Sequence, residues 1–308
     1  MATTLLDLLG AMDGRLPAID DGVLRLSYAD VQRSIAGERR WLQSMGVRRC
    51  ALLAENSSRW VLSDLALLAS EAVNVPLSPS CTREQIEHVL ADANVDWILT
   101  DQAEGVLRDQ PELNYVATSH RTGLSLLRRD AASDQPRGHA ADIGKVIYPS
   151  DGAKGVSLRQ CAIQSLVDAL AAATAGLGVQ THLCILPLAS LLESIAGVYL
   201  PLTMGAKVLV RPRHTLGTSH AGLNVTLLLN AIDSTAPDSM ILVPPLLSAL
   251  VRAIHEGWRA PSSLKFIAVG EDVSTELLQQ ARSSGLPMLQ VRIGALGETD
   301  AAPNVTVS

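Results

Sequence analysis

The residues best suited to chemistry lie in one short segment, Lys145–Val156, which reads KVIYPSDGAKGV. In it an aliphatic run enters a turn of small and polar residues, and a helix-forming segment follows. Main-chain N–H groups of a turn ahead of a helix can point at a phosphate group. The candidate phosphate-binding residues are Ser150, Asp151, Gly152, Lys154 and Gly155. Taken alone, these residues favour the simpler interpretation, an ordinary turn between a strand and a helix.

The cysteines and one basic segment are also considered as candidate sites. We interpret the four cysteines, which are distant from one another in the sequence, as buried thiols of a reducing cytosol rather than as metal ligands or disulfides. They are Cys50, Cys81, Cys161 and Cys184. The basic segment Arg211–His214 follows a predicted strand. A solvated turn is favoured there over an anion-binding site.

The elements that would position these residues alternate along the chain. Short β-branched or aliphatic segments alternate with segments of helical periodicity, which is typical of a parallel sheet covered by helices. We therefore predict an α/β fold with two mostly parallel sheets flanked by helices. The predicted strands are Cys50–Ala54, Val73–Leu77, Val95–Thr100, Tyr115–Thr118, Lys145–Tyr148, His182–Leu186, Lys207–Val210, Met240–Val243, Lys265–Val269 and Met288–Val291.

Local signals mark helix starts and a linker. Thr82 and Gln85 have the spacing of a capping box, which predicts that a helix begins there. The segment Arg128–Gly144 is polar and rich in turn-forming residues, which indicates a linker. We therefore place a first α/β subdomain at residues 1–140 and a second at residues 141–308, the second containing the candidate phosphate loop.

Composition limits the classes of function. The 308 residues carry 25 basic and 31 acidic side chains, a net charge of −6. The basic residues are scattered, so we predict no nucleic-acid partner. No apolar run approaches the length of a membrane span, and acidic residues stand where a signal peptide needs positive charge. We therefore expect a cytoplasmic protein without a transmembrane segment.

Phrases along nearly the whole chain resemble the adenylate-forming, or AMP-binding, superfamily, and in particular its long-chain fatty-acid-CoA ligases. Leu26–Val31 resembles the family phrase LTYAEL, and Glu71–Leu77 resembles GAxxVPL. Leu186–Ala206 is similar to LPLAxxxE followed by GxYxPLxxGA, and Val269–Ser274 resembles the turn GGAxLS. The resemblance implies the large N-terminal domain of an acyl-CoA synthetase, with ATP, Mg²⁺ and CoA as cofactors.

The nucleotide-binding phrases of this family are altered in the chain. Tyr148–Val156 stands at the phosphate-binding phrase YTSGTTGxPKGV, but only six steps separate Tyr148 from Lys154, against nine in the family phrase. The loop thereby loses on the order of 10 Å of reach. Asp151 would also place a carboxylate beside phosphate oxygens. The turn GGAxLS keeps Gly270, followed by two acidic residues. These changes predict weakened binding of ATP.

The second family signature, YGxTE, supplies a phosphate-contacting threonine and a Mg²⁺-binding glutamate. We favour the register Leu296–Asp300, in which Gly297 and Thr299 bind the nucleotide and Asp300 replaces the glutamate as metal ligand. An alternative register begins at Ile293. A solvated loop without a site is a third interpretation.

The resemblance also implies an acyl pocket. Its candidate residues are Ser190, where many relatives have histidine, together with Glu193, Val243 and Pro244. The segments that contain them are apolar enough to line a ligand tunnel. A plain hydrophobic core is the simpler interpretation of the same segments.

Three functions stay open at this point. The family's ribose-binding aspartate, hinge and C-terminal domain with its adenylation lysine would follow Ser308, so we expect the small domain to be absent and assign no certain catalytic residue. The first function is a truncated, catalytically impaired pseudoenzyme that keeps the acyl-activating fold. The second is an active fatty-acid or carboxylate-CoA ligase fragment completed by a separate C-terminal domain. The third is a non-catalytic protein that binds an acyl group or a protein partner.

Overall fold

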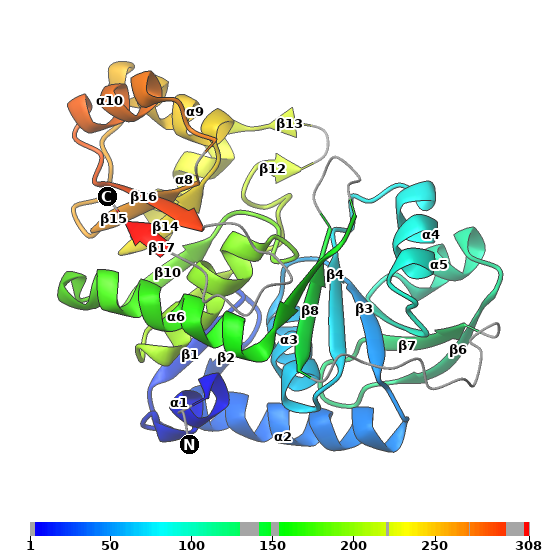
Figure 1. The fold of residues 1–308 in the computed structure, drawn as a ribbon. Helices are drawn as coiled ribbons and strands as arrows, with labels where there is room; N and C mark the ends of the chain where they lie inside the picture. The colour runs from blue at the N-terminus through cyan, green and yellow to red at the C-terminus, as the bar shows by residue number, and fades with distance from the viewer. Residues whose placement is uncertain are drawn as a thin grey trace. The chain divides into compact units, whose positions relative to one another are not determined.

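The computed structural model describes residues 4–129, 142–148, 154–219, 222–270, 272–293 and 305–307. The chain divides into two compact units, which Figure 1 shows with their elements labelled. Residues 1–28, 165–295 and 302–308 belong to a unit with an eight-stranded sheet, and residues 29–164 belong to a unit with a seven-stranded sheet. The predicted fold class, α/β with two sheets flanked by helices, is confirmed. The predicted domain limits, 1–140 and 141–308, stay a prediction.

The eight-stranded sheet has a parallel centre with antiparallel edges. Its strands are β1 (Pro17–Asp20), β2 (Arg25–Ser27), β10 (Thr181–Cys184), β11 (Lys207–Val210), β14 (Ser239–Leu242), β15 (Phe266–Val269), β16 (Met288–Ile293) and β17 (Val305–Val307). Their spatial order is β17-β16-β15-β14-β10-β11-β1-β2. The pairs β16–β17 and β1–β2 are antiparallel and the pairs between them are parallel. Every residue of β14 and β15 is buried, as expected for parallel strands covered on both faces.

Helices and a short hairpin complete this unit. They are α1 (Leu5–Ala11), a 3₁₀ turn (Ala175–Leu177), a π-helix (Glu193–Tyr199), α7 (Leu200–Thr203), the hairpin β12 (Thr218–Ser219) and β13 (Gly222–Leu223), α8 (Val225–Thr235), α9 (Pro244–His255) and α10 (Thr275–Ser283). The Ser274 hydroxyl accepts a hydrogen bond from the Leu277 N–H at 3.2 Å, so α10 begins with a side-chain cap. α9 packs against both α8 and α10 (Figure 1).

The seven-stranded sheet is parallel at its centre only. Its unit contains α2 (Tyr28–Ser44), β3 (Arg49–Leu53), α3 (Ser58–Ala69), β4 (Val73–Leu77), α4 (Arg83–Asp92), β5 (Trp97–Thr100), α5 (Ala103–Asp109), β6 (Leu113–Thr118), β7 (Ser125–Arg129), β8 (Ile143–Ile147) and β9 (Val156–Arg159). The spatial order is β6-β7-β5-β3-β4-β8-β9. The pairs β5–β3, β3–β4 and β4–β8 are parallel, and the outer pairs are antiparallel. The boundary between the two units falls within α6 (Gln160–Thr174).

The predicted strands and one predicted helix cap agree with the structure, whereas the predicted linker is shorter. Each predicted strand overlaps an observed strand, and Thr82 forms the predicted capping box with Gln85 at the start of α4. The linker predicted at Arg128–Gly144 is shorter, because Arg128 and Arg129 belong to β7, which pairs with β5, and Ile143 opens β8. Residues 130–141 lie outside the described part of the chain. Among the described residues, the helices are too short or too polar to cross a bilayer.

Candidate functional site

The candidate site lies at the carboxyl ends of the central strands of the eight-stranded sheet. β10 pairs in parallel with both β11 and β14, so the segments that follow these three strands meet at one edge of the sheet. Ligands of open α/β sheets bind outside the carboxyl ends of parallel strands. Three segments are thereby brought together: 185–190 after β10, 211–218 after β11 and 243–246 after β14.

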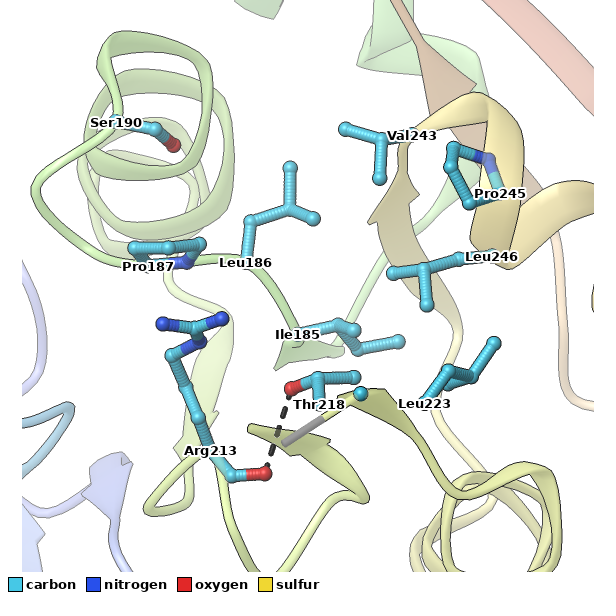
Figure 2. Close-up of a pocket in the computed structure, with 11 residues that line it drawn as sticks. Ile185, Leu186, Pro187, Ser190, Arg213, Thr218, Leu223, Val243, Pro245 and Leu246 are labelled. Atoms are coloured by element: carbon cyan, nitrogen blue, oxygen red, sulfur yellow. Dashed lines mark hydrogen bonds between the residues drawn. The ribbon is translucent and has the colours of Figure 1, made fainter. Parts of the chain in front are cut away.

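A pocket of about 310 Å³ lies between these segments. Aliphatic side chains dominate its wall, and Figure 2 shows Leu186, Val243 and Leu246 extending into the same space. The lining residues are Ile185, Leu186, Pro187, Ser190, Arg213, Thr218, Gly222, Leu223, Val243, Pro245 and Leu246. An apolar concavity with a few polar groups is typical of a small-molecule site.

Arg213 contributes a cation to this apolar pocket. Its guanidinium lies beside Pro187 in Figure 2, and its main-chain oxygen accepts hydrogen bonds from the Thr218 N–H at 3.0 Å and the Thr218 hydroxyl at 3.3 Å. Arg211 instead pairs with Asp20 at 3.2 Å, and its side chain is only 22% exposed. The segment forms the predicted turn, and His214 is exposed there, but Arg211 and Arg213 are half-buried rather than solvated.

The structure brings two of the four predicted acyl-pocket residues together in this pocket. Ser190 and Val243 belong to its lining. Pro244 lies outside the lining and occupies the first turn of α9, where its missing N–H costs no hydrogen bond. Glu193 is buried behind the wall, where its carboxylate accepts a hydrogen bond from the Leu186 N–H at 3.2 Å. Acyl binding by these four residues stays a prediction.

The candidate phosphate segment connects two antiparallel strands rather than a strand and a helix. β8 pairs with β9, with Ile147 opposite Val156, and α6 begins only at Gln160. A helix follows the segment as predicted, but the strand β9 lies between the turn and α6. The physical reason is that Leu158 is buried while its neighbours on β9 are exposed, so this segment fits the edge of a sheet. Ser150, Asp151 and Gly152 lie outside the described residues.

The described end of this loop packs against the protein's own side chains. A Cβ on Gly155 would lie 2.6 Å from Cζ of Tyr148 and 2.8 Å from Cγ1 of Val146. The Tyr148 hydroxyl donates to the Asp92 carboxylate at 2.6 Å, which holds the ring in that place. Lys154 is exposed. The small size of Gly155 is thus required by internal packing, and phosphate binding by Gly155 and Lys154 stays a prediction.

Gly270 follows β15, at the same edge of the sheet as the pocket. A Cβ added to Gly270 would lie 3.0 Å from the Asp272 Oδ1, so the carboxylate of this exposed residue lies beside the glycine. Gly297, Thr299 and Asp300, the candidate nucleotide and metal residues of the second signature, lie outside the described part of the chain.

A separate cluster of polar side chains lies buried between β10 and the π-helix. The donor atoms of His182, Cys184 and Glu193 lie within 4.8 Å of one another, and each residue is at most 1% exposed. This cluster was not predicted from the sequence, because the cysteines were interpreted as isolated thiols. Residues two apart on a strand share a face, so the spacing of His182 and Cys184 is the signal that could have found it. All four cysteines are free, but Cys161 is exposed and Cys81 half-buried, contrary to the prediction for these two.

Comparison with known proteins places the fold in a family. The family described as AMP-binding enzyme matches residues 11–307. The chain belongs to the AMP-binding enzymes. It is 25% identical over 218 residues to surfactin synthase subunit 1 of Bacillus subtilis, an alignment that spans 68% of this chain and 6% of that protein. The AMP-binding resemblance drawn from the sequence is confirmed.

Solved structures of two AMP-binding relatives share the fold. A long-chain-fatty-acid-CoA ligase (FadD1) from Archaeoglobus fulgidus superposes with a TM-score of 0.74 at 19% identity, over 99% of this chain and 66% of that chain. A nonribosomal peptide synthetase, FmoA3, with bound α-methyl-L-serine-AMP superposes with a TM-score of 0.76 at 21% identity, over 99% of this chain and 34% of that one. This AMP-binding chain therefore spans no more than about two thirds of either structure.

Proposed function

We propose that this AMP-binding family member is a catalytically impaired acyl-activating protein that binds a carboxylic acid with an apolar tail. The pocket at the sheet edge carries the proposal. Its aliphatic wall, including Leu186, Val243 and Leu246, suits a hydrocarbon, and Arg213 suits the carboxylate at the head of the same ligand. The fatty-acid class follows from this combination of an apolar wall with one guanidinium.

The proposed impairment is in the binding of ATP, not in the binding of the carboxylic acid. The loop after Tyr148 is three residues shorter than the family phrase, and the ring of Tyr148 fills the space beside Gly155. In the turn after β15, the Asp272 carboxylate lies beside Gly270. A purine ring or a phosphate would need a neutral surface at this position. Each of these features supports the proposal that ATP binds weakly, and CoA has no use without an adenylate. We propose the cytosol as the location.

The carboxylate contact is tested by calorimetry with decanoate. Arg213→Met is expected to weaken decanoate binding about 10- to 100-fold, because a hydrogen bond to a charged group contributes roughly 1.5–3 kcal/mol. The matched control is Arg252→Met, since Arg252 is an exposed arginine on α9 outside the pocket lining. Decanol should bind Arg213→Met and the unchanged protein alike. The proposal would be contradicted if Arg213→Met bound decanoate as tightly as the unchanged protein, or if neither of these two proteins bound it.

A series of acids of increasing chain length tests the apolar wall. Each buried methylene contributes about 0.8 kcal/mol, so two added methylenes should raise the affinity roughly tenfold until the pocket is filled. Leu246→Trp, which enlarges a side chain of the wall, should shorten the longest acid that still gains affinity. An affinity that does not depend on chain length would exclude this pocket as the acyl site.

Pyrophosphate exchange separates this proposal from the active-ligase alternative. With ATP, Mg²⁺ and the tightest-binding acid, we expect no exchange above background and no heat from ATP alone. The alternative function, a ligase completed by a separate C-terminal domain, predicts exchange when such a domain from a longer relative is added. Exchange by the chain alone, or restored by that domain, would overturn the proposed impairment.

A further inference from the structure

Two buried polar atoms behind the pocket wall face one another without hydrogen bonds. Within the described part of the chain, Nε2 of His182 and Oε1 of Glu193 have no hydrogen-bond partner, and they lie 3.5 Å apart. The thiol of Cys184 lies in the same cluster. The two atoms form a histidine–carboxylate pair, and the Cys184 thiol also interacts with the Glu193 carboxylate. A separation of 3.5 Å is long for a hydrogen bond, so the pair leaves room for a group that binds to both atoms.

We propose that His182, Cys184 and Glu193 form a buried metal site that takes Zn²⁺. Imidazole nitrogen, thiolate sulfur and carboxylate oxygen are the three donor types that zinc binds in proteins. Zinc–ligand bonds of roughly 2.0–2.3 Å separate tetrahedral donor atoms by about 3.3–3.6 Å. The distance of 3.5 Å between the His182 nitrogen and the Glu193 oxygen falls in that range. The sulfur, within 4.8 Å of both, needs to move by roughly 1 Å or less.

The charges and the fourth donor fit the same ion. A carboxylate and a thiolate together neutralise a divalent cation, so the occupied site places no net charge in the protein interior. The Cys184 thiol donates a hydrogen bond to the main-chain oxygen of Gly197, on the π-helix, at 3.6 Å. Once the thiol gives up its proton to bind the ion, this oxygen is released and is the proposed fourth donor. π-helical segments are frequent at functional sites, because their wider turn changes the placement of side chains and carbonyl groups.

Hydrogen bonds from neighbouring groups orient two of the proposed ligands, His182 and Glu193. The His182 Nδ1 is hydrogen-bonded to the Ser239 hydroxyl at 2.9 Å, which directs Nε2 toward the cluster. The second oxygen of Glu193 accepts the Leu186 N–H, which directs Oε1 toward the cluster. Partners of this kind set the orientation of metal ligands in proteins. A Cβ on Gly197 would lie 2.6 Å from the Glu193 Oε1 and 2.9 Å from the His182 Nε2, so a glycine is needed to make room for the cluster.

The ion would link β10 to the π-helix across the segment that forms one wall of the pocket. Leu186 lies between the two ligand-bearing elements, and its N–H is held by Glu193. Metal binding would therefore fix the main chain at this wall. This role is independent of whether the pocket binds a carboxylic acid.

Metal analysis of the purified 308-residue chain tests the proposal. We expect about one zinc ion per chain after dialysis against metal-free buffer, and a thiolate-to-cobalt charge-transfer band when the chelator-treated protein is titrated with Co²⁺. Cys184→Ala should abolish this band and weaken zinc binding by at least about 100-fold. The control is Cys50→Ala, which removes an equally buried cysteine from β3 and should change neither result.

Two results would overturn the site. One is a chain that carries no zinc and gives only the spectrum of hydrated cobalt. The other is a Cys184→Ala protein that binds zinc as tightly as the Cys50→Ala protein, which would indicate a site elsewhere on the molecule. If Cys184→Ala fails to fold, the cobalt titration is repeated with Glu193→Gln. A thiolate band that weakens in Glu193→Gln supports the cluster, and a band that does not change assigns the thiolate to another cysteine and overturns the site.

Discussion

Replacing Asp64 with asparagine is expected to lower the free energy of unfolding by about 3–5 kcal/mol, because it leaves a buried ammonium group without the carboxylate that compensates its charge. Lys145 on β8 pairs with Asp64 on α3 at 2.7 Å, and neither side chain is exposed. Asn74 on β4 also donates to the same carboxylate oxygen, at 2.5 Å. The loss is a large fraction of the stability of an ordinary domain, and urea denaturation measures it.

A matched control and a double variant isolate the effect of burial. Arg83 and Glu87 on α4 also lie 2.7 Å apart, but their side chains are 53% and 44% exposed. Glu87→Gln should therefore cost no more than about 0.5 kcal/mol. Lys145→Met combined with Asp64→Asn should recover most of the loss, since no buried charge remains. A cost for Asp64→Asn as small as that for Glu87→Gln would contradict the prediction.

The pH dependence of the same variant gives a second signature. Burial lowers the pKa of Lys145 below its ordinary value of 10.5, whereas Asp64 acts to raise it. The unfolded chain then binds the proton more tightly than the folded chain, so stability increases as the pH rises toward 10.5. Removing Asp64 should lower the pKa of Lys145 further and so extend this increase to lower pH. The double variant with methionine at position 145 should lack the increase.

Gly197→Ala is expected to destabilise the eight-stranded unit. Overpacking costs about 1–3 kcal/mol in general, and we expect a value near the upper end of that range. The added Cβ would lie within 3.0 Å of both the Glu193 Oε1 and the His182 Nε2. Glu193 cannot withdraw freely, because its other oxygen is bound to the Leu186 N–H. An ordinary helical glycine behaves in the opposite way, since alanine stabilises a helix by up to about 1 kcal/mol.

The control for Gly197→Ala is Gly105→Ala on α5, where nothing lies within 4 Å of an added Cβ. This substitution should leave stability unchanged or raise it slightly. A double-variant cycle with Glu193→Ala should show a coupling of more than about 0.5 kcal/mol, because removing the carboxylate frees the space that the new methyl group needs. A Gly197→Ala protein as stable as the Gly105→Ala protein would mean that the cluster is loosely packed.

The sequence by itself determined those features that depend on neighbours along the chain. The buried strands Val73–Leu77 and Lys207–Val210 have the predicted bounds, because short aliphatic runs between turn residues leave few alternatives. The cap at Thr82 was predicted because its hydroxyl bonds an N–H three residues later. The superfamily was also recognisable, since its phrases lie in these packed strands and turns.

Only the tertiary structure decided which distant residues meet. Arg213 follows one strand and Val243 another, and the pairing of β10 with both neighbours brings them into one pocket. Lys145 looks like an exposed polar residue in the sequence, but it is fully buried because Asp64 lies opposite. Such contacts depend on the order of the strands in the sheet and on which charged side chains are buried. Hydrophobic periodicity in the sequence predicts neither. Local patterns therefore identified the elements, whereas long-range packing placed Arg213 at the pocket and gathered His182, Cys184 and Glu193 behind its wall.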